Sequence, residues 1–184
     1  MKNATVILFY LLPFFVVAQE KNDSAKISKN TIFIEVLGNG IIGSINYDKV
    51  MKFRNHKISY RIGLGYLPIN SDFQKIYSVP IEFNSIHGNE HNIEFGIGAT
   101  YAYGFNSDND PSGNQYSSSA IYATLRVFGY RYQRIDGGFF LKTGLLAFME
   151  IVELNFQYKN VRKNDPPVFP SLGLGIGYTF KTKK

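Results

Sequence analysis

Apolar and polar residues alternate one by one along several segments of the chain, with turn-forming residues between the segments. The clearest case is the segment 171–180, where one face holds only small or polar residues. The opposite face is wholly apolar and carries Leu172, Leu174, Ile176, Tyr178 and Phe180. Side chains of a β-strand point alternately to its two faces, so a period of two predicts strands. Alternating segments near ten residues long are typical of transmembrane β-barrels. The pattern predicts an all-β fold, an antiparallel up-and-down transmembrane barrel.

The alternation predicts eight strands, which cover residues 31–48, 57–66, 76–84, 91–105, 119–128, 138–148, 150–158 and 171–180. The first changes parity, and the glycines at 38, 40 and 43 predict a β-bulge within it. Segment 150–158 is included because single-chain bacterial barrels have an even strand count. Pro80 has no N–H for strand pairing, so its strand is expected to bulge or end there. This layout puts the long connection 106–117 on the periplasmic side, where turns are normally short, so either a boundary is wrong or the barrel departs from that rule.

The faces opposite the apolar ones are rich in glycine and carry few charges. Charged residues concentrate instead in predicted connections such as 48–57 and 159–165. A soluble barrel would expose its polar faces to water, where Lys and Glu are common. Inward glycines suit a narrow eight-stranded barrel, whose interior has room only for packed side chains. The apolar faces are therefore predicted to face lipid. A soluble periplasmic lipocalin-like binding barrel, with an apolar cavity inside, is the alternative.

Six inward strand positions are ionisable, three acidic and three basic: Glu35, Arg61, Glu82, Glu94, Arg126 and Lys142. Unpaired charges in a narrow interior are costly, whereas opposite charges that pair there hold each other. We therefore predict a structural network of salt bridges that fills the barrel. A narrow channel or transporter is the alternative interpretation of the same residues.

The N-terminal residues predict export from the cytoplasm. Lys2 precedes a short apolar stretch, and small residues lead to a cleavage site near Ala18, which together indicate a signal peptide over residues 1–18. The apolar stretch is shorter than the roughly 20 residues that a spanning helix needs. Polar residues 19–30 are expected to form a flexible periplasmic leader. The barrel is then predicted over 31–181, with a basic tail at 182–184, in the cell outer membrane of a Gram-negative bacterium.

Composition removes several classes of chemistry. The chain has no Cys, so it offers no disulfide and no thiol chemistry. Its formal net charge is +6, but Lys and Arg are dispersed, which argues against nucleic-acid binding. Three histidines are present, and His87 and His91 bracket a turn with Glu90 close to Ser85. These residues keep open the alternative of a lipid-modifying outer-membrane enzyme, although their spacing does not require it. We predict no catalytic, cofactor-binding or metal-binding residues.

The closing residues 175–180 resemble the β-signal of outer-membrane proteins, which is a Gly followed by aromatic or apolar residues at alternate positions. The resemblance assigns that role to Gly175, Tyr178 and Phe180, and implies recognition by the barrel-assembly machinery during insertion. Further strand-like motifs occur at residues 35–40, 44–47, 60–66, 94–98 and 129–140. With them, most of the chain is similar to a family of uncharacterised small outer-membrane β-barrel proteins of Gram-negative bacteria. That family implies a fold and a location but no activity.

The sequence thus predicts an outer-membrane β-barrel with a packed polar interior and a structural or surface-interaction role. Its expected partners are outer-membrane lipid and the barrel-assembly machinery, and it is expected to be a monomer. Basic residues at Lys49, Lys52, Arg54, Arg162 and Lys163 are candidates for contact with anionic lipid headgroups.

Overall fold

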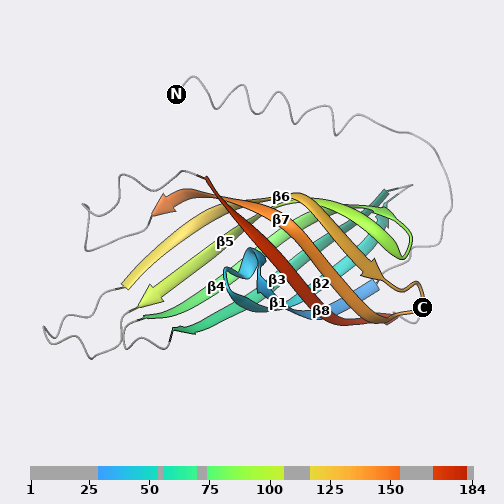
Figure 1. Ribbon diagram of the computed structural model, residues 1–184, viewed down its shortest axis with the longest axis horizontal. Helices are drawn as coiled ribbons and strands as arrows, with labels where there is room; N and C mark the ends of the chain where they lie inside the picture. The colour runs from blue at the N-terminus through green and yellow to red at the C-terminus, as the bar shows by residue number, and fades with distance from the viewer. Residues whose placement is uncertain (1–28, 54–55, 70–73, 106–116, 154–167, 182–184) are drawn as a thin grey trace, which may run out of the picture.

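The computed structural model describes residues 29–53, 56–69, 74–105, 117–153 and 168–181. These residues form a closed barrel in which each strand pairs antiparallel with its neighbours in sequence, and β1 pairs with β8 (Figure 1). The strands are β1 Lys29–Leu37, β2 Gly43–Phe53, β3 His56–Ile69, β4 Gln74–Gly88, β5 His91–Phe105, β6 Ser117–Gln133, β7 Gly138–Glu153 and β8 Val168–Lys181. The predicted all-β barrel of eight strands is confirmed. Over the described ranges, no helix has the length and apolar character needed to cross a membrane.

The predicted first strand, 31–48, is wrong, because this segment is a hairpin. β1 and β2 are joined through a short 3₁₀ turn, η2 (Gly38–Gly40). Leu37, Gly38 and Ile41 all have positive φ, and Leu37 N donates a hydrogen bond to Ile42 O at 2.6 Å. Glycine adopts this left-handed backbone without steric cost, which Gly38 uses where the chain reverses rather than bulges. The reversal also explains the change of parity that the sequence shows.

The predicted separate strand at 150–158 is also wrong. Its first residues, 150–153, are the end of β7, and residues 154–158 lie outside the described part of the chain. One predicted strand is therefore two, and another is part of its neighbour. The strand count of eight is right only because these two errors cancel.

The corrected hairpin also changes which connections share an end of the barrel. The connections 70–73, 106–116 and 154–167 join strands at one end, called here the loop end. The tight connections 54–55, 89–90 and 134–137 lie at the other, the turn end, where β1 begins and β8 finishes. The connection 106–117 was expected at the end of the barrel where the turns are short, and this expectation is wrong. Counting the hairpin as one strand reversed the expected direction of the strands that follow it, and so exchanged the ends at which their connections lie.

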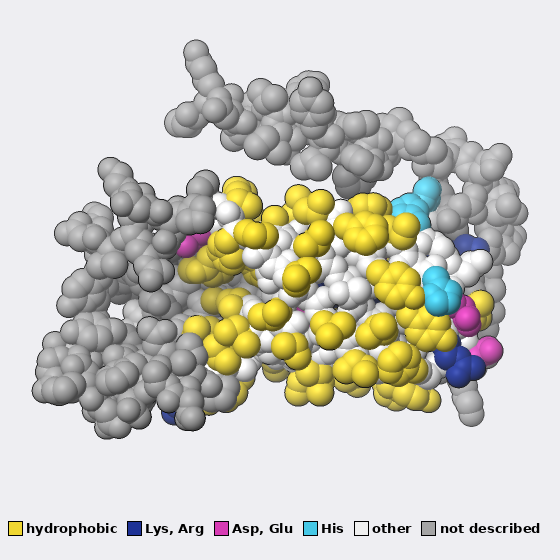
Figure 2. Space-filling model, in the orientation of Figure 1, with side chains coloured by type: hydrophobic (Ala, Val, Ile, Leu, Met, Phe, Trp, Pro, Cys, Tyr) yellow, Lys and Arg dark blue, Asp and Glu magenta, His cyan; other side chains and the backbone are white. Residues whose placement is uncertain are grey.

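Apolar side chains cover the outside of the barrel and polar side chains fill the inside. Leu64, Ile45 and Ile97 are 71, 62 and 58% exposed and point outward. Figure 2 shows hydrophobic side chains over the visible face of the barrel. By contrast, most of the fully buried side chains are polar or charged. This arrangement is the reverse of a soluble barrel, which buries its apolar face. The lipocalin-like alternative expected an apolar interior, and the charged groups described below occupy it instead.

Bulges in β6 decide which of its residues face inward. The register of β6 against β7 shifts between Ile121 and Tyr122 and again between Arg126 and Phe128. A bulge moves the following residues to the other face, so Arg126 and Arg131 both point into the barrel although they are an odd number of residues apart. Pro80 produces no bulge. The register of β3 against β4 is the same on both sides of it, so the expectation that its strand bulges or ends there is wrong.

Candidate functional site

The β1–β2 turn lies inside the barrel rather than at its rim. Figure 1 shows the short blue coil of η2 about midway along the barrel. Gly38, Asn39 and Gly40 are buried. Thr100 Oγ1 donates a hydrogen bond to Asn39 O at 2.8 Å, and Ser78 Oγ donates one to Gly40 O at 2.9 Å. Side chains from the opposite wall therefore hold the turn across the interior.

Among the described residues, eight ionisable side chains are buried on the turn-end side of η2. Four are acidic and four are basic, so their formal charges sum to zero: Glu35, Asp48, Glu82, Glu94, Arg61, Arg126, Arg131 and Lys142. The structure brings together all six of the residues singled out from the sequence. These six residues come from β1 and from β3 to β7. Their ion pairs therefore connect strands that are not neighbours in the barrel wall.

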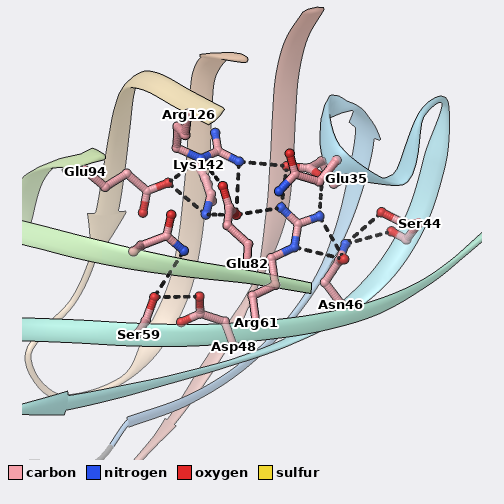
Figure 3. A network of polar contacts seen from close by, with 12 residues as sticks. Glu35, Ser44, Asn46, Asp48, Ser59, Arg61, Glu82, Glu94, Arg126 and Lys142 are labelled. Carbon is pink, nitrogen blue, oxygen red and sulfur yellow. Dashed lines mark hydrogen bonds and ion pairs between the residues drawn. The ribbon is translucent and has the colours of Figure 1, made fainter. Parts of the chain in front are cut away.

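Arg61 joins the turn to the centre of the barrel. Its Nη1 donates to Glu35 Oε1 at 3.1 Å and to Glu82 Oε2 at 3.3 Å, and its Nη2 also contacts Glu35. Its Nε donates to Asn46 Oδ1 at 3.0 Å. Figure 3 shows this guanidinium between Glu35, Asn46 and Glu82. The Nε, Nη1 and Nη2 atoms of Arg61 thus each meet an acceptor, as a buried guanidinium requires.

Two carboxylates and two cations form the centre of the network. Arg126 Nε lies 2.8 Å from Glu82 Oε1 and 3.3 Å from Glu94 Oε1. Lys142 Nζ lies 2.7 Å from Glu94 Oε1 and 3.4 Å from Glu82 Oε2 (Figure 3). Each acid is thus shared by both cations. Such sharing compensates buried charge better than isolated pairs would, because no group is left without an opposite charge.

Asp48 and Arg131 extend the network toward the turn end and were missed in the sequence. Arg131 donates to Asp48 from Nη1 at 2.9 Å and from Nη2 at 2.8 Å, and its Nε donates to Glu94 Oε2 at 2.8 Å. Asp48 is the boundary between the predicted first strand, 31–48, and the charged connection 48–57, and the predicted strand 119–128 stops short of Arg131. The sequence does contain a pattern that could have found Arg131, because Gly129, Arg131 and Gln133 alternate with two tyrosines as in a strand.

Two buried phenylalanines pack against the guanidinium groups. Arg61 Cζ lies 5.1 Å from the centre of the Phe33 ring, and Arg131 Cζ lies 5.4 Å from that of Phe140. The two rings are in turn 5.1 Å apart. Such cation–π contacts stabilise a desolvated cation without adding charge. They explain how aromatic bulk and four basic groups fit in the same narrow interior.

The predicted assembly-signal residues lie on both faces of β8. Gly175 faces inward, where an added Cβ would come within 2.9 Å of the Phe33 ring, so only glycine leaves room for that ring. Tyr178 and Phe180 face outward, 54 and 46% exposed, with ring centres 5.0 Å apart. This placement gives Gly175 a packing role of its own. Recognition by the assembly machinery stays a prediction.

The histidine cluster proposed for the enzyme alternative is only partly assembled. Ser85 Oγ and His87 Nε2 are 3.0 Å apart on the outer surface, and His91 Nδ1 lies 2.6 Å from Tyr130 Oη. Glu90 Oε1 instead accepts a hydrogen bond from the Ile135 N–H at 3.1 Å. A serine nucleophile needs a base that is itself oriented by a third group, and Glu90 is engaged in the turn. Among the described residues, no group of three potential ligands is arranged for a metal ion.

A closed antiparallel barrel with an apolar exterior and a charge-balanced interior defines a transmembrane β-barrel. Its interior is filled by side chains and by its own first turn. No family model matches the chain, and no curated protein matches it. Among solved structures, it is similar to the crystal structure of Neisserial surface protein A, with a TM-score of 0.48 and 12% identity. That match covers 88% of this chain and 100% of the other. The fold assignment rests on the closed strand pairing.

Proposed function

We propose that this chain is an outer-membrane β-barrel of a Gram-negative bacterium whose interior is a structural core and whose loop end faces the cell surface. The observation that carries the proposal is the charge-balanced network, in which eight buried ionisable groups pair across the barrel beneath an inserted turn. A water-filled pore needs a polar lumen that is left open, whereas here the charged side chains pair with one another across the interior. The proposed role is structural support and surface interaction rather than transport.

The distribution of connections supports the orientation. Bacterial barrels have short periplasmic turns and longer extracellular loops. The longest connections, 106–116 and 154–167, both belong to the loop end. We therefore place the loop end outside the cell and the turn end in the periplasm. Export by a signal peptide over residues 1–18, cleaved near Ala18, and insertion through the closing β-signal belong to the same proposal.

A basic rim at the turn end supports contact with anionic phospholipid headgroups. Lysines at 29, 49, 52 and 57 lie near this end of β1, β2 and β3. Lys29 Nζ donates to Arg134 O at 3.3 Å and Lys57 Nζ to Gly88 O, so both are anchored to neighbouring turns. A basic side chain at an anionic membrane surface contributes about 1 kcal/mol. The rim favours an orientation with this end at the inner, phospholipid leaflet.

The proposal is tested by expressing the full chain, separating membranes from the soluble periplasm, and running the membrane extract on a gel with and without boiling. We expect detergent-dependent extraction and a band that shifts on heating, because a closed barrel stays folded in the unheated sample. Protease added to intact cells should cut at the loop end, for example within 106–116, and not at the turn end. Release of the protein with the soluble periplasm, or cleavage only at the turn end, would refute the location or the orientation.

A further inference from the structure

The barrel wall is incomplete near the loop end. The pairing of β1 with β8 stops at Leu37 and Gly173, and that of β2 with β3 stops at Ser44 and Gly65. β3 continues over 66–69 and β8 over 168–172, where no described strand pairs with them on the side of the missing hairpin. The wall has eight strands toward the turn end but six beyond the hairpin tip. These two free edges and the tip are called the seam.

Each free edge carries a proline. Pro68 lies in β3 beyond Gly65, and Pro170 lies in β8 before Gly173. Proline has no N–H to donate, so it is tolerated at a sheet edge and opposes the addition of another strand. The two prolines therefore disfavour the addition of a strand from another chain at these edges.

The inner lining beside the seam is aromatic and apolar, unlike the charged part below η2. Phe148 is 2% exposed, and its ring stacks on that of Phe169 with centres 5.1 Å apart and planes 2° apart. Tyr122 meets both rings edge-on, at 6.4 and 5.9 Å. Leu146, which is 2% exposed, lies above the turn, because an added Cβ on Gly173 would come within 3.3 Å of its Cδ1 and 3.2 Å of Gly38 Cα. The same added Cβ would come within 3.2 Å of Glu35 Oε1, so the charged network begins directly beside Leu146. The ring contacts of Phe148 are aromatic.

The apolar lining is continuous with the lipid-facing surface. Phe169 has the strand parity of inward residues, yet it is 39% exposed, whereas its stacking partner is almost fully buried. Around it, Leu172 on β8 is 59% exposed, and Leu37 and Ile42 at the hairpin tip are 47 and 38% exposed. In a bilayer, lipid chains rather than water contact an apolar surface at such a gap in the barrel wall.

We propose that the seam binds one acyl chain of a membrane phospholipid, which enters sideways between the edges of β3 and β8 and lies against Phe169 and the hairpin tip. An acyl chain suits the seam because it is narrow, flexible and needs no hydrogen-bond partner. The charged network under η2 limits how deep the chain can go, since an apolar chain cannot replace an ion pair there. This inference rests on the proposed membrane location.

The test uses the full chain folded into vesicles of phospholipid that carries a photoactivatable diazirine at the end of one acyl chain. After irradiation, the labelled residues are mapped by mass spectrometry. Lipids around any barrel label outward residues such as Leu172. Only a chain inside the seam labels the inward-facing Phe169 and the tip at Ile41.

Two substitutions at one position separate the site from a general loss of structure. Phe169→Glu places a charge in the seam and should abolish labelling of the tip, whereas Phe169→Leu keeps an apolar side chain and should retain it. Phe139→Glu is the matched control, because it puts the same charge on the lipid-facing side near the turn end. A heat-shifted band shows that each variant is folded.

The outcomes are distinguishable. Labelling of the tip that is lost in Phe169→Glu and kept in Phe169→Leu and Phe139→Glu supports the inference. Labelling confined to outward residues in a folded, inserted barrel overturns the inference and leaves the proposed location intact. A chain that does not insert at all overturns the proposed function first, and the inference with it.

Discussion

Arg131 offers the sharpest test of the view that the interior is a balanced ionic core. The substitution Arg131→Met keeps much of the side-chain length and removes the charge. The interior then holds four acids and three bases, and Asp48 loses both of the hydrogen bonds that it accepts from this guanidinium. Glu94 keeps Lys142 at 2.7 Å and Arg126 at 3.3 Å. The damage should therefore centre on Asp48.

The expected loss follows from the contacts. At an effective dielectric constant of 20, opposite charges 4 Å apart attract by about 4 kcal/mol, most of which the cost of desolvation offsets in the intact pair. Removing one partner leaves the other buried and uncompensated, which costs about 3–5 kcal/mol. We expect Arg131→Met to lower the free energy of unfolding by that amount. Adding Asp48→Asn removes the stranded charge and should restore about 1–3 kcal/mol, the size of coupling found between contacting residues.

The assay is a urea titration in phospholipid vesicles, in which the heat-shifted and unshifted gel bands report the folded fraction. The chain has no Trp, so the gel or tyrosine fluorescence replaces the usual indole signal. The free energy of unfolding comes from the midpoint and slope of each titration. Arg134→Met is the control, because Arg134 lies exposed in the turn between β6 and β7 and its removal should change the free energy by less than 0.5 kcal/mol, as is usual for surface substitutions.

The reasoning fails if Arg131→Met and Arg134→Met have the same free energy of unfolding. It also fails if Asp48→Asn adds its full cost to that of Arg131→Met, because additive effects would mean that the two residues do not interact. Either result would show that water or ions, rather than the protein's own side chains, compensate the interior charges.

Three further predictions concern packing, lipid contact and conduction. Gly98→Ala should lower the free energy of unfolding by about 1–3 kcal/mol in the same titration, because the new Cβ would lie 2.2 Å from Ile81 O, a backbone atom; Ala99→Gly, on the outer face, is its control. Leu64→Arg should cost about 2–4 kcal/mol in vesicles, since this side chain is 71% exposed on the lipid-facing side, and an unchanged stability would argue that it meets water. The purified barrel should give no stable conductance steps in planar bilayers, and steps that change in Glu94→Gln would instead favour the channel alternative.

The strand bounds were predicted best where residues alternate regularly between the two faces of a strand. β5 has the predicted bounds, and β8 extends the predicted 171–180 by three residues at its start and one at its end. In both, small residues alternate with large apolar ones, so the face that each residue occupies can be read directly. The six predicted interior charges all lie inside the barrel, because the alternation holds over the few residues around each one even where a bulge or the hairpin follows.

The errors arose where the chain departs from regular alternation. The β1–β2 hairpin lacks the polar loop that usually separates strands, because its turn Gly38–Gly40 is buried and Asn39 is its one polar residue. The bulge at Arg126 shifts the parity of β6, which hid Arg131 from a strict period of two. Both features depend on contacts with distant strands, and periodicity within one segment carries no information about those contacts.

The zero sum of the interior charges has a consequence for the response of the barrel to voltage. Moving one elementary charge through a potential of 100 mV takes about 2.3 kcal/mol. Four acids and four bases that are linked by short ion pairs move together or not at all. A potential across the membrane therefore does almost no net work on them, and the interior has no gating charge with which to sense it.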